Sequence, residues 1–260
     1  MTDVTTPLAC IAAVVALVAA ARGTWSPCGL SMLSSITPLA ERGRGHRYRS
    51  TAVWFVAGAL AGGLTLGLAA AVLAAAVSAA GPSTTTLLAL ACVAGVLAAA
   101  SDARLGGFHL PIHRRQVNER WLDQFRPWVY GAGFGWQIGV GLATYIKTAA
   151  VYLTIVLLAL SGDPWAALGV GALFGLARGL AVLLGRHITS FDLLARFHRR
   201  VHELDGPSVA AVVAVEVSTA LLCGWLLSPW ALITVAVPSA VVALRRARRR
   251  LPARPGAART

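Results

Sequence analysis

Charged side chains are scarce in this chain. They make up 13% of its 260 residues, and only ten residues are Asp or Glu. A soluble globular domain carries about 25% charged residues. Hydrophobic residues account for 57% of the sequence, and the mean hydropathy is +0.70. So little polar sequence cannot cover so much apolar sequence, which excludes a water-soluble domain and predicts that the lipid bilayer is the solvent.

The sequence also lacks the motifs of several enzyme classes. It has no Walker phosphate loop, no Gly-rich dinucleotide fingerprint and no serine-hydrolase elbow. Its four cysteines include no Cys-x-x-Cys pair and no spacing typical of a metal site. His198 and His202 lie four residues apart, which permits a metal site, but we favour a surface that faces lipid headgroups. Neither a metal nor a cofactor is therefore expected.

Positive charge is abundant but unevenly placed. The net charge is +13, and four segments hold 20 of the 23 Lys and Arg residues: 41–50, 102–128, 186–206 and the tail from 245. The connecting segments that hold none are 1–6, 79–84, 161–164 and 228–230. Because basic segments near span ends stay in the cytoplasm, this alternation predicts a multi-pass protein of the cytoplasmic (plasma) membrane. We expect the N-terminus outside, the C-terminus in the cytoplasm, and anionic headgroups rather than nucleic acid as partners.

The apolar runs predict about seven membrane-spanning helices. The first run, 8–39, is too long for the roughly 30 Å bilayer core as one helix, and Pro27 lies in its middle. We therefore expect a break at Trp25-Ser26-Pro27-Cys28-Gly29. The segment 190–204 has an apolar and a basic face, which favours a surface helix over a solvated linker. The other expected spans are 51–78, 84–101, 129–160, 164–185, 208–227 and 230–244.

A weak internal repeat suggests how the spans are organised. Gly58-Ala59-Leu60-Ala61-Gly62 matches Gly171-Ala172-Leu173-Phe174-Gly175, although Ala/Gly-rich helices also produce such matches by chance. We predict an all-α bundle over 1–244, with two inverted three-helix repeats at about 8–101 and 129–227. An extra span at 230–244 and a basic tail at 245–260 would complete it. Small residues at 58, 62, 67, 131, 135, 139, 171 and 175 are expected to let the helices approach closely.

Cys28 follows a proline at the predicted break. The amides and the dipole at the start of a helix stabilise a thiolate, so Cys28 is a candidate reactive thiol. The alternative is that it packs as a small apolar residue, as buried cysteines usually do. Cys92 and Cys223 fall in the outer halves of their predicted spans, so either could meet Cys28 or could serve packing alone.

The element Ser26-Pro27-Cys28-Gly29-Leu30, in an apolar segment that ends Ile36-Thr37-Pro38-Leu39, resembles the membrane domain of the CcdA/DsbD family. Those are cytochrome c biogenesis and thiol–disulfide interchange proteins. The resemblance covers roughly 8–227, and only the first span is specific. It implies that Cys28 is one of two cycling intramembrane thiols, which pass reducing equivalents from a cytoplasmic thioredoxin-like donor to an extracytoplasmic thiol acceptor.

The same resemblance implies roles for neighbouring residues. Pro27, Gly29 and Pro38 would support the site at the helix break. The family's second cysteine should fall near Gly139, where this chain has glycine. Cys223 or Cys92 would have to take its place.

Three charged residues stand within apolar runs: Lys147, Arg178 and Glu216. Such residues are costly in a membrane and usually face the protein interior. Arg178 and Glu216 lie at similar predicted depths, so we expect them to pair, either as a structural ion pair or as an anion or proton site. Lys147 is expected to hold an anionic solute, to lower the pKa of a nearby thiol, or to extend outward. Arg22, just before the break, could likewise face a cavity.

These observations favour a membrane thiol–disulfide oxidoreductase with Cys28 and either Cys223 or Cys92 as the exchanging pair. One alternative is a small-solute or ion transporter on the same fold, with Arg178, Glu216 and Lys147 along the path. Another is a non-catalytic membrane subunit. The redox function needs a second sulfur close to Cys28, whereas transport needs a polar cavity that reaches the three charges.

Overall fold

The computed structural model describes residues 2–111 and 120–227, and every regular element in this part of the chain is a helix. In chain order the helices are α1 (Thr2–Gly23), α2 (Pro27–Ser35), α3 (Pro38–Gly43), α4 (Tyr48–Ala80), α5 (Thr84–Asp102), η1 (Leu105–Gly107), α6 (Trp121–Gln124), α7 (Pro127–Val140), α8 (Ala150–Ser161), α9 (Pro164–Leu180), η2 (Ala181–Gly185) and α10 (Phe191–Leu227). Five segments are long and apolar enough to cross a membrane: Val4–Gly23, Tyr48–Ala80, Thr84–Asp102, Pro164–Gly185 and Phe191–Leu227. The chain is therefore an all-α, multi-pass membrane protein.

The expected seven spans are not all confirmed. The predicted span 129–160 is divided into α7 and α8, with the non-helical connection 141–149 between them. Gly141 begins this connection at a φ of +73°, a backbone conformation that favours glycine. The predicted span 230–244 and tail 245–260 lie outside the described residues, and the inverted-repeat organisation stays a prediction.

The first apolar segment is broken where the sequence predicts. Helix α1 ends at Gly23 and α2 begins at Pro27, so the expected break at 25–29 is confirmed. The Ser26 hydroxyl accepts a hydrogen bond from the Gly29 amide at 3.0 Å and caps α2. The Thr37 hydroxyl caps α3 in the same way, accepting from the Ala40 amide at 3.1 Å. Proline at the first helical position suits both starts, because its missing N–H needs no partner there.

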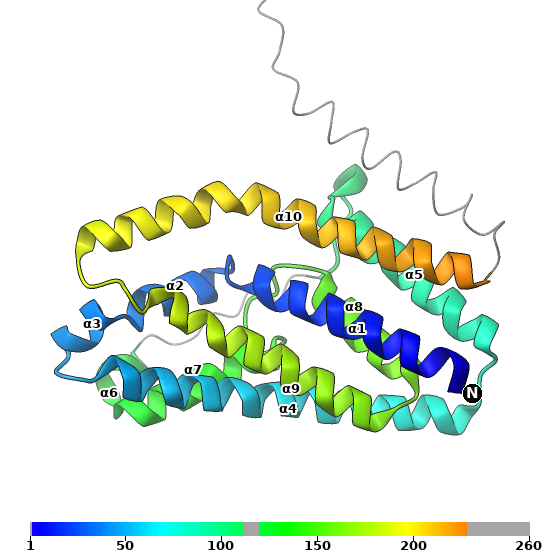
Figure 1. The fold of residues 1–260 in the computed structure, drawn as a ribbon, viewed down its shortest axis with the longest axis horizontal. Helices are drawn as coiled ribbons and strands as arrows, with labels where there is room; N and C mark the ends of the chain where they lie inside the picture. Colours follow the sequence, from blue (N-terminus) through cyan, green and yellow to red (C-terminus); the bar gives the residue numbers. More distant parts are fainter. Residues whose placement is uncertain (1, 112–119, 228–260) are drawn as a thin grey trace, which may run out of the picture.

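The helices pack lengthwise in a bundle (Figure 1). Helix α4 lies against α7 and α9, α10 lies along α5, and α1 packs against α8 and α9. Glycines bring the backbones into contact: a Cβ atom on Gly58 would lie 2.0 Å from the Ala132 carbonyl oxygen, and one on Gly63 would lie 2.3 Å from that of Gly171. The predicted close approach of small residues is thus confirmed, and the two glycine segments of the proposed repeat pack against each other.

Helix α10 continues through a position where the sequence predicts a boundary. The expected surface helix 190–204 and the expected span 208–227 form one helix of 37 residues, about 55 Å long. Pro207 lies inside it, and the Ser208 hydroxyl donates a hydrogen bond to the Asp205 carbonyl oxygen at 2.7 Å. This hydroxyl adds a hydrogen bond to a backbone carbonyl in the turn that contains the proline.

Candidate functional site

Two cavities meet where the helices are broken, and together they form what we call the polar chamber. One has a volume of about 390 Å³ and lies among the ends of α1 and α5, the connection 141–149 and α10. The other has a volume of about 550 Å³ and lies beside Trp25 and the first half of α10. Lys147 and Asp205 line both cavities. Non-helical backbone is tolerated at membrane depth where it lines such a polar space.

Arg22 and Asp205 form the central ion pair of the chamber. The Arg22 Nη1 atom lies 2.6 Å from the Asp205 carboxylate and donates a second hydrogen bond to the Ser208 hydroxyl at 2.8 Å. The guanidinium also lies over the Trp25 ring, 5.8 Å from its centre, and the Trp25 indole donates to the Val201 carbonyl oxygen at 2.7 Å. Arg22 is buried and lines the 390 Å³ cavity, as the sequence predicts. These contacts attach the first helix break to α10.

Asp102, the last residue of α5, fixes the second break. Its carboxylate accepts hydrogen bonds from the Thr148 hydroxyl and from the Ala149 amide, the latter at 2.8 Å. A carboxylate at the start of a helix satisfies orphan amides and complements the helix dipole. Asp102 therefore positions α8, and with it the wall of the chamber that carries Lys147.

The chamber carries more positive than negative charge. Arg22, Arg104 and Lys147 face Asp102 and Asp205 across the 390 Å³ cavity. Both carboxylates are engaged by the contacts above, whereas Lys147 and Arg104 form no hydrogen bond or ion pair with any described residue. Two cations thus remain for a ligand, and the arrangement is suited to an anionic group.

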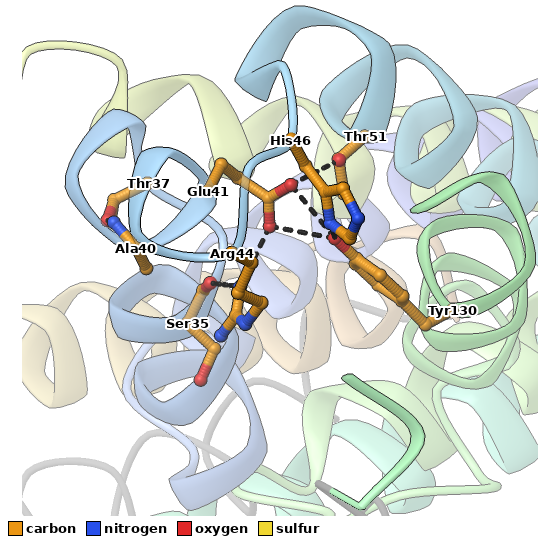
Figure 2. A network of polar contacts seen from close by, with 8 residues as sticks. All are labelled: Ser35, Thr37, Ala40, Glu41, Arg44, His46, Thr51 and Tyr130. Carbon is orange, nitrogen blue, oxygen red and sulfur yellow. Dashed lines mark hydrogen bonds and ion pairs between the residues drawn. The ribbon is translucent and has the colours of Figure 1, made fainter. Parts of the chain in front are cut away.

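A second polar cluster surrounds Glu41, which the sequence reasoning missed (Figure 2). The Glu41 carboxylate is fully buried and accepts hydrogen bonds from the Thr51 hydroxyl at 2.6 Å and the Tyr130 hydroxyl at 2.9 Å. Arg44 completes an ion pair with it at 2.9 Å, and His46 Nδ1 lies 3.3 Å from the Tyr130 hydroxyl oxygen. The cluster joins α3 to α4 and α7. The signal that the sequence offered for this cluster was the position of Glu41, an acidic residue at the start of the basic segment 41–50.

The buried charges of the apolar runs do not meet as predicted. The two ion pairs between described residues are Arg22–Asp205 and Arg44–Glu41, so the expected Arg178–Glu216 pair is not formed. Helix α9, with Arg178, packs against α4 and α1, whereas α10, with Glu216, packs against α5 and α1. Similar depth therefore does not bring the two side chains together. Lys147 is exposed and lines both cavities of the chamber.

The cysteines are distributed over separate parts of the bundle. None of the four, all within the described residues, is in a disulfide; Cys28, Cys92 and Cys223 are buried and Cys10 is exposed. Cys28 belongs to an apolar cluster with Met32 and Phe134, whereas Cys92 and Cys223 belong to a different one. The Cys92 thiol donates to the Ala220 carbonyl oxygen at 3.4 Å, across the contact of α5 with α10. The structure therefore places neither predicted partner in the cluster of Cys28.

Gly139 is the position at which the resembled family would carry its second cysteine. A Cβ atom there would lie only 2.1 Å from the Ala59 carbonyl oxygen. Helix α7 approaches the backbone of α4 so closely that no side chain fits. Gly139 therefore serves helix packing, as predicted for the small residues of these helices. Pro27, Gly29 and Pro38 lie at the starts of α2 and α3.

The fold and the chamber define a class: multi-pass helical membrane proteins with two interrupted helices around a polar space. Within it, the chain belongs to the family of the methylamine utilization protein MauF. It is 30% identical to MauF of Paracoccus versutus over 223 residues, which cover 81% of this chain and 80% of that protein. Identity to MauF of Methylobacillus flagellatus is 30% over 202 residues, covering 74% and 70%, and to that of Methylophilus methylotrophus 28% over 218 residues, covering 80% and 75%. No protein-family model and no solved structure matches the chain.

Family membership corrects the function expected from the sequence. The five curated relatives at 28–30% identity all carry the name MauF, and none is a CcdA/DsbD protein. The resemblance built on Ser26-Pro27-Cys28-Gly29-Leu30 was therefore wrong. So were the thiol–disulfide transfer, with its thioredoxin-like donor and thiol acceptor, and the alternative of a solute or ion transporter. A Pro-Cys pair at a helix break is too short a feature to carry a function, because proline and a small residue suit any such break.

Proposed function

We propose that this chain is a membrane protein of methylamine utilization that acts by binding an anionic group in the polar chamber. The observation that carries the proposal is the charge of the chamber in a member of the MauF family. Lys147 and Arg104 line the 390 Å³ cavity without a partner among the described residues, while Asp102 and Asp205 are engaged. A cavity of this size accommodates a group much larger than a single ion.

The same charge disfavours methylamine itself as the ligand. Methylamine is a cation at neutral pH, and a site for it would offer an unengaged carboxylate or an aromatic cage. Here Asp205 is paired with Arg22, and Asp102 caps α8. The chain therefore serves the use of methylamine without holding methylamine in this chamber.

We place the protein in the cytoplasmic membrane with its N-terminus outside. The basic segments 41–50 and 186–206 support this orientation, since such segments stay on the cytoplasmic side. In this orientation the chamber lies toward the cytoplasmic end of α1, because Arg22 is in the last turn of that helix. Anionic headgroups would lie against the basic segments themselves.

The test is genetic and uses the intact protein. The gene is deleted in its own organism, and growth is measured with methylamine and with ammonium as the nitrogen source. We expect the deletion strain to grow with ammonium but not with methylamine, and the wild-type gene to restore growth with methylamine. The variants Lys147→Glu and Arg104→Glu, which reverse the charge offered to an anion, should fail to restore growth. Lys147→Arg and the surface control Arg186→Ala should succeed.

The outcomes separate the two parts of the proposal. Unchanged growth of the deletion strain on methylamine would refute the role in methylamine utilization. Full restoration by both charge-reversed variants, each present in the membrane at the wild-type level, would show that the chamber does not bind an anion that the role requires. Membrane levels are compared by immunoblot, so that loss of the protein is not taken for loss of the site.

A further inference from the structure

Arg178 is a buried cation with an unsatisfied hydrogen-bond donor. It lies in the last turn of α9, its exposed fraction is 4%, and its Nη2 atom has no hydrogen-bond partner. Neither ion pair of the described residues includes it. The guanidinium lies against the backbone of the first helix break, since a Cβ atom on Gly23 would be 2.6 Å from Nη1. Its other neighbours include the Phe174 ring, 5.7 Å away, and Cys28, whose thiol carries no fixed charge.

A buried guanidinium in an apolar bundle requires a compensating charge. Arginine does not lose its proton at accessible pH, so it cannot be buried as a neutral group. An aromatic ring offers only weak compensation. An unpaired buried donor adds a further desolvation cost. The charge of Arg178 is therefore best balanced by something that occupies the space beside it.

A small cavity borders Arg178 and the first helix break. It has a volume of about 20 Å³ and is lined by Gly23, Thr24, Gly29 and Arg178 together with apolar side chains. It shares no lining residue with the polar chamber. Helix α2, nine residues long, begins at this cavity, and the positive end of its dipole adds to the guanidinium charge.

The size of the cavity limits the ligand. About 10–15 Å³ of such volume accommodates one water molecule, so the space beside Arg178 suits one small particle better than phosphate or an organic acid. A water molecule would satisfy the Nη2 donor and leave the charge unbalanced. We infer that this cavity binds a single monovalent inorganic anion, chloride under cellular conditions, which Arg178 holds at the start of α2.

Thermal unfolding of the purified full-length protein in detergent tests this inference. The protein is titrated from sodium gluconate into sodium chloride at constant ionic strength, and unfolding is followed by tryptophan fluorescence. A ligand that binds only the folded state raises Tm with its concentration. We expect a rise of roughly 3–6 °C at ten times the Kd, growing with the logarithm of the chloride concentration above that, and a similar rise with bromide. Gluconate is too large to enter and should have no effect.

Two variants assign the effect to Arg178. In Arg178→Gln the chloride dependence should disappear, whereas Arg104→Gln, in the polar chamber, should keep it. If Arg178→Gln does not fold, Arg178→Lys can replace it: this variant keeps the positive charge on a shorter side chain and should bind chloride more weakly. Broadening of the ³⁵Cl NMR line by the wild-type protein supplies an independent measurement.

Three results would overturn the inference. The first is a wild-type Tm that does not differ between chloride and gluconate, which leaves only water in the cavity. The second is an equal chloride effect in Arg178→Gln and the wild type, which places the anion elsewhere. The third is a loss of the chloride response in Arg104→Gln alone, which places it in the polar chamber.

Discussion

The guanidinium of Arg22 lies 2.6 Å from the carboxylate of Asp205, although 183 residues separate them in the chain. Arg22 is in the last turn of α1, just before the first helix break, and Asp205 precedes Pro207 in α10. The side chain of Arg22 is 6% exposed and that of Asp205 is 43% exposed. The pair therefore forms part of the chamber wall, with Arg22 on its buried side and Asp205 on its open side. Its position makes it the link between the two sides of the polar chamber.

A double-mutant cycle on Arg22→Ala and Asp205→Ala should reveal this link. Because Asp205 is partly exposed, we expect a coupling of about 1–2 kcal/mol, between the values for surface and buried pairs. Each single variant should lower Tm by several degrees, and the double variant by less than the sum. The measurement is thermal unfolding in detergent. Ser208→Ala, which keeps the ion pair but removes the second acceptor of Arg22 and the hydrogen bond to the Asp205 carbonyl oxygen, serves as the milder control. Additive single effects would show that the two residues act independently.

The sequence predicts the features of this fold that depend on local chemistry. Pro27 in the middle of an apolar run too long for the bilayer predicts the break between α1 and α2, and Ser26 caps the new helix. Scarce charge predicts the membrane class, and glycines at helical spacing predict the close packing of α4. Each of these follows from the stretch of chain in which it occurs.

The remainder depends on which helices are neighbours, and that information is not local. Depth along a helix can be read from the sequence, and Arg178 and Glu216 have similar predicted depths, but α9 packs mainly against α4 and α10 mainly against α5. The interruption at 141–149 was missed because the run 129–160 contains no proline. It is fixed by Asp102, a residue of another helix. Glu41 was missed for the same reason, since Tyr130 is 89 residues away.

Replacing the buried acid of the second cluster should destabilise the protein markedly. Glu41→Gln removes the charge that Arg44 pairs with and turns an amide donor toward the Thr51 and Tyr130 hydroxyls. Leaving buried donors unmatched costs about 2–3 kcal/mol where a charged group is involved. Tyr130→Phe, which removes one donor and keeps the ring, should cost only about 1 kcal/mol. Thermal unfolding of both variants checks the order. Equal Tm values for Glu41→Gln and the wild type would contradict a stabilising role of the cluster.

Labelling of the thiols should follow burial and not redox state. Cys10 is exposed, the other three cysteines are buried, and none of these four described residues is in a disulfide. N-Ethylmaleimide should therefore add one label to the folded protein and four after denaturation, as counted by intact mass. Cys10→Ala should lower both numbers by one. Prior treatment with a reductant should leave the counts unchanged, and an increase would reveal a disulfide that the structure does not contain.

Two glycines in α9 provide a matched test of the helix packing. A Cβ atom on Gly171 would lie 2.4 Å from the Gly67 Cα atom and 2.6 Å from the Gly63 carbonyl oxygen, whereas one on Gly169 would meet nothing within 4 Å. Because backbone atoms cannot move aside as a side chain can, Gly171→Ala should separate α9 from α4 at a cost of about 1–3 kcal/mol.

Gly169→Ala should instead be neutral or stabilising by about 0.5–1 kcal/mol, since alanine loses less conformational entropy in a helix. Thermal unfolding in one detergent measures both variants, and their Tm values should move in opposite directions. Similar shifts for the two would contradict the backbone contact between α4 and α9. A loss of Tm in Gly171→Ala alone would confirm it, because the two substitutions add the same methyl group two residues apart in one helix.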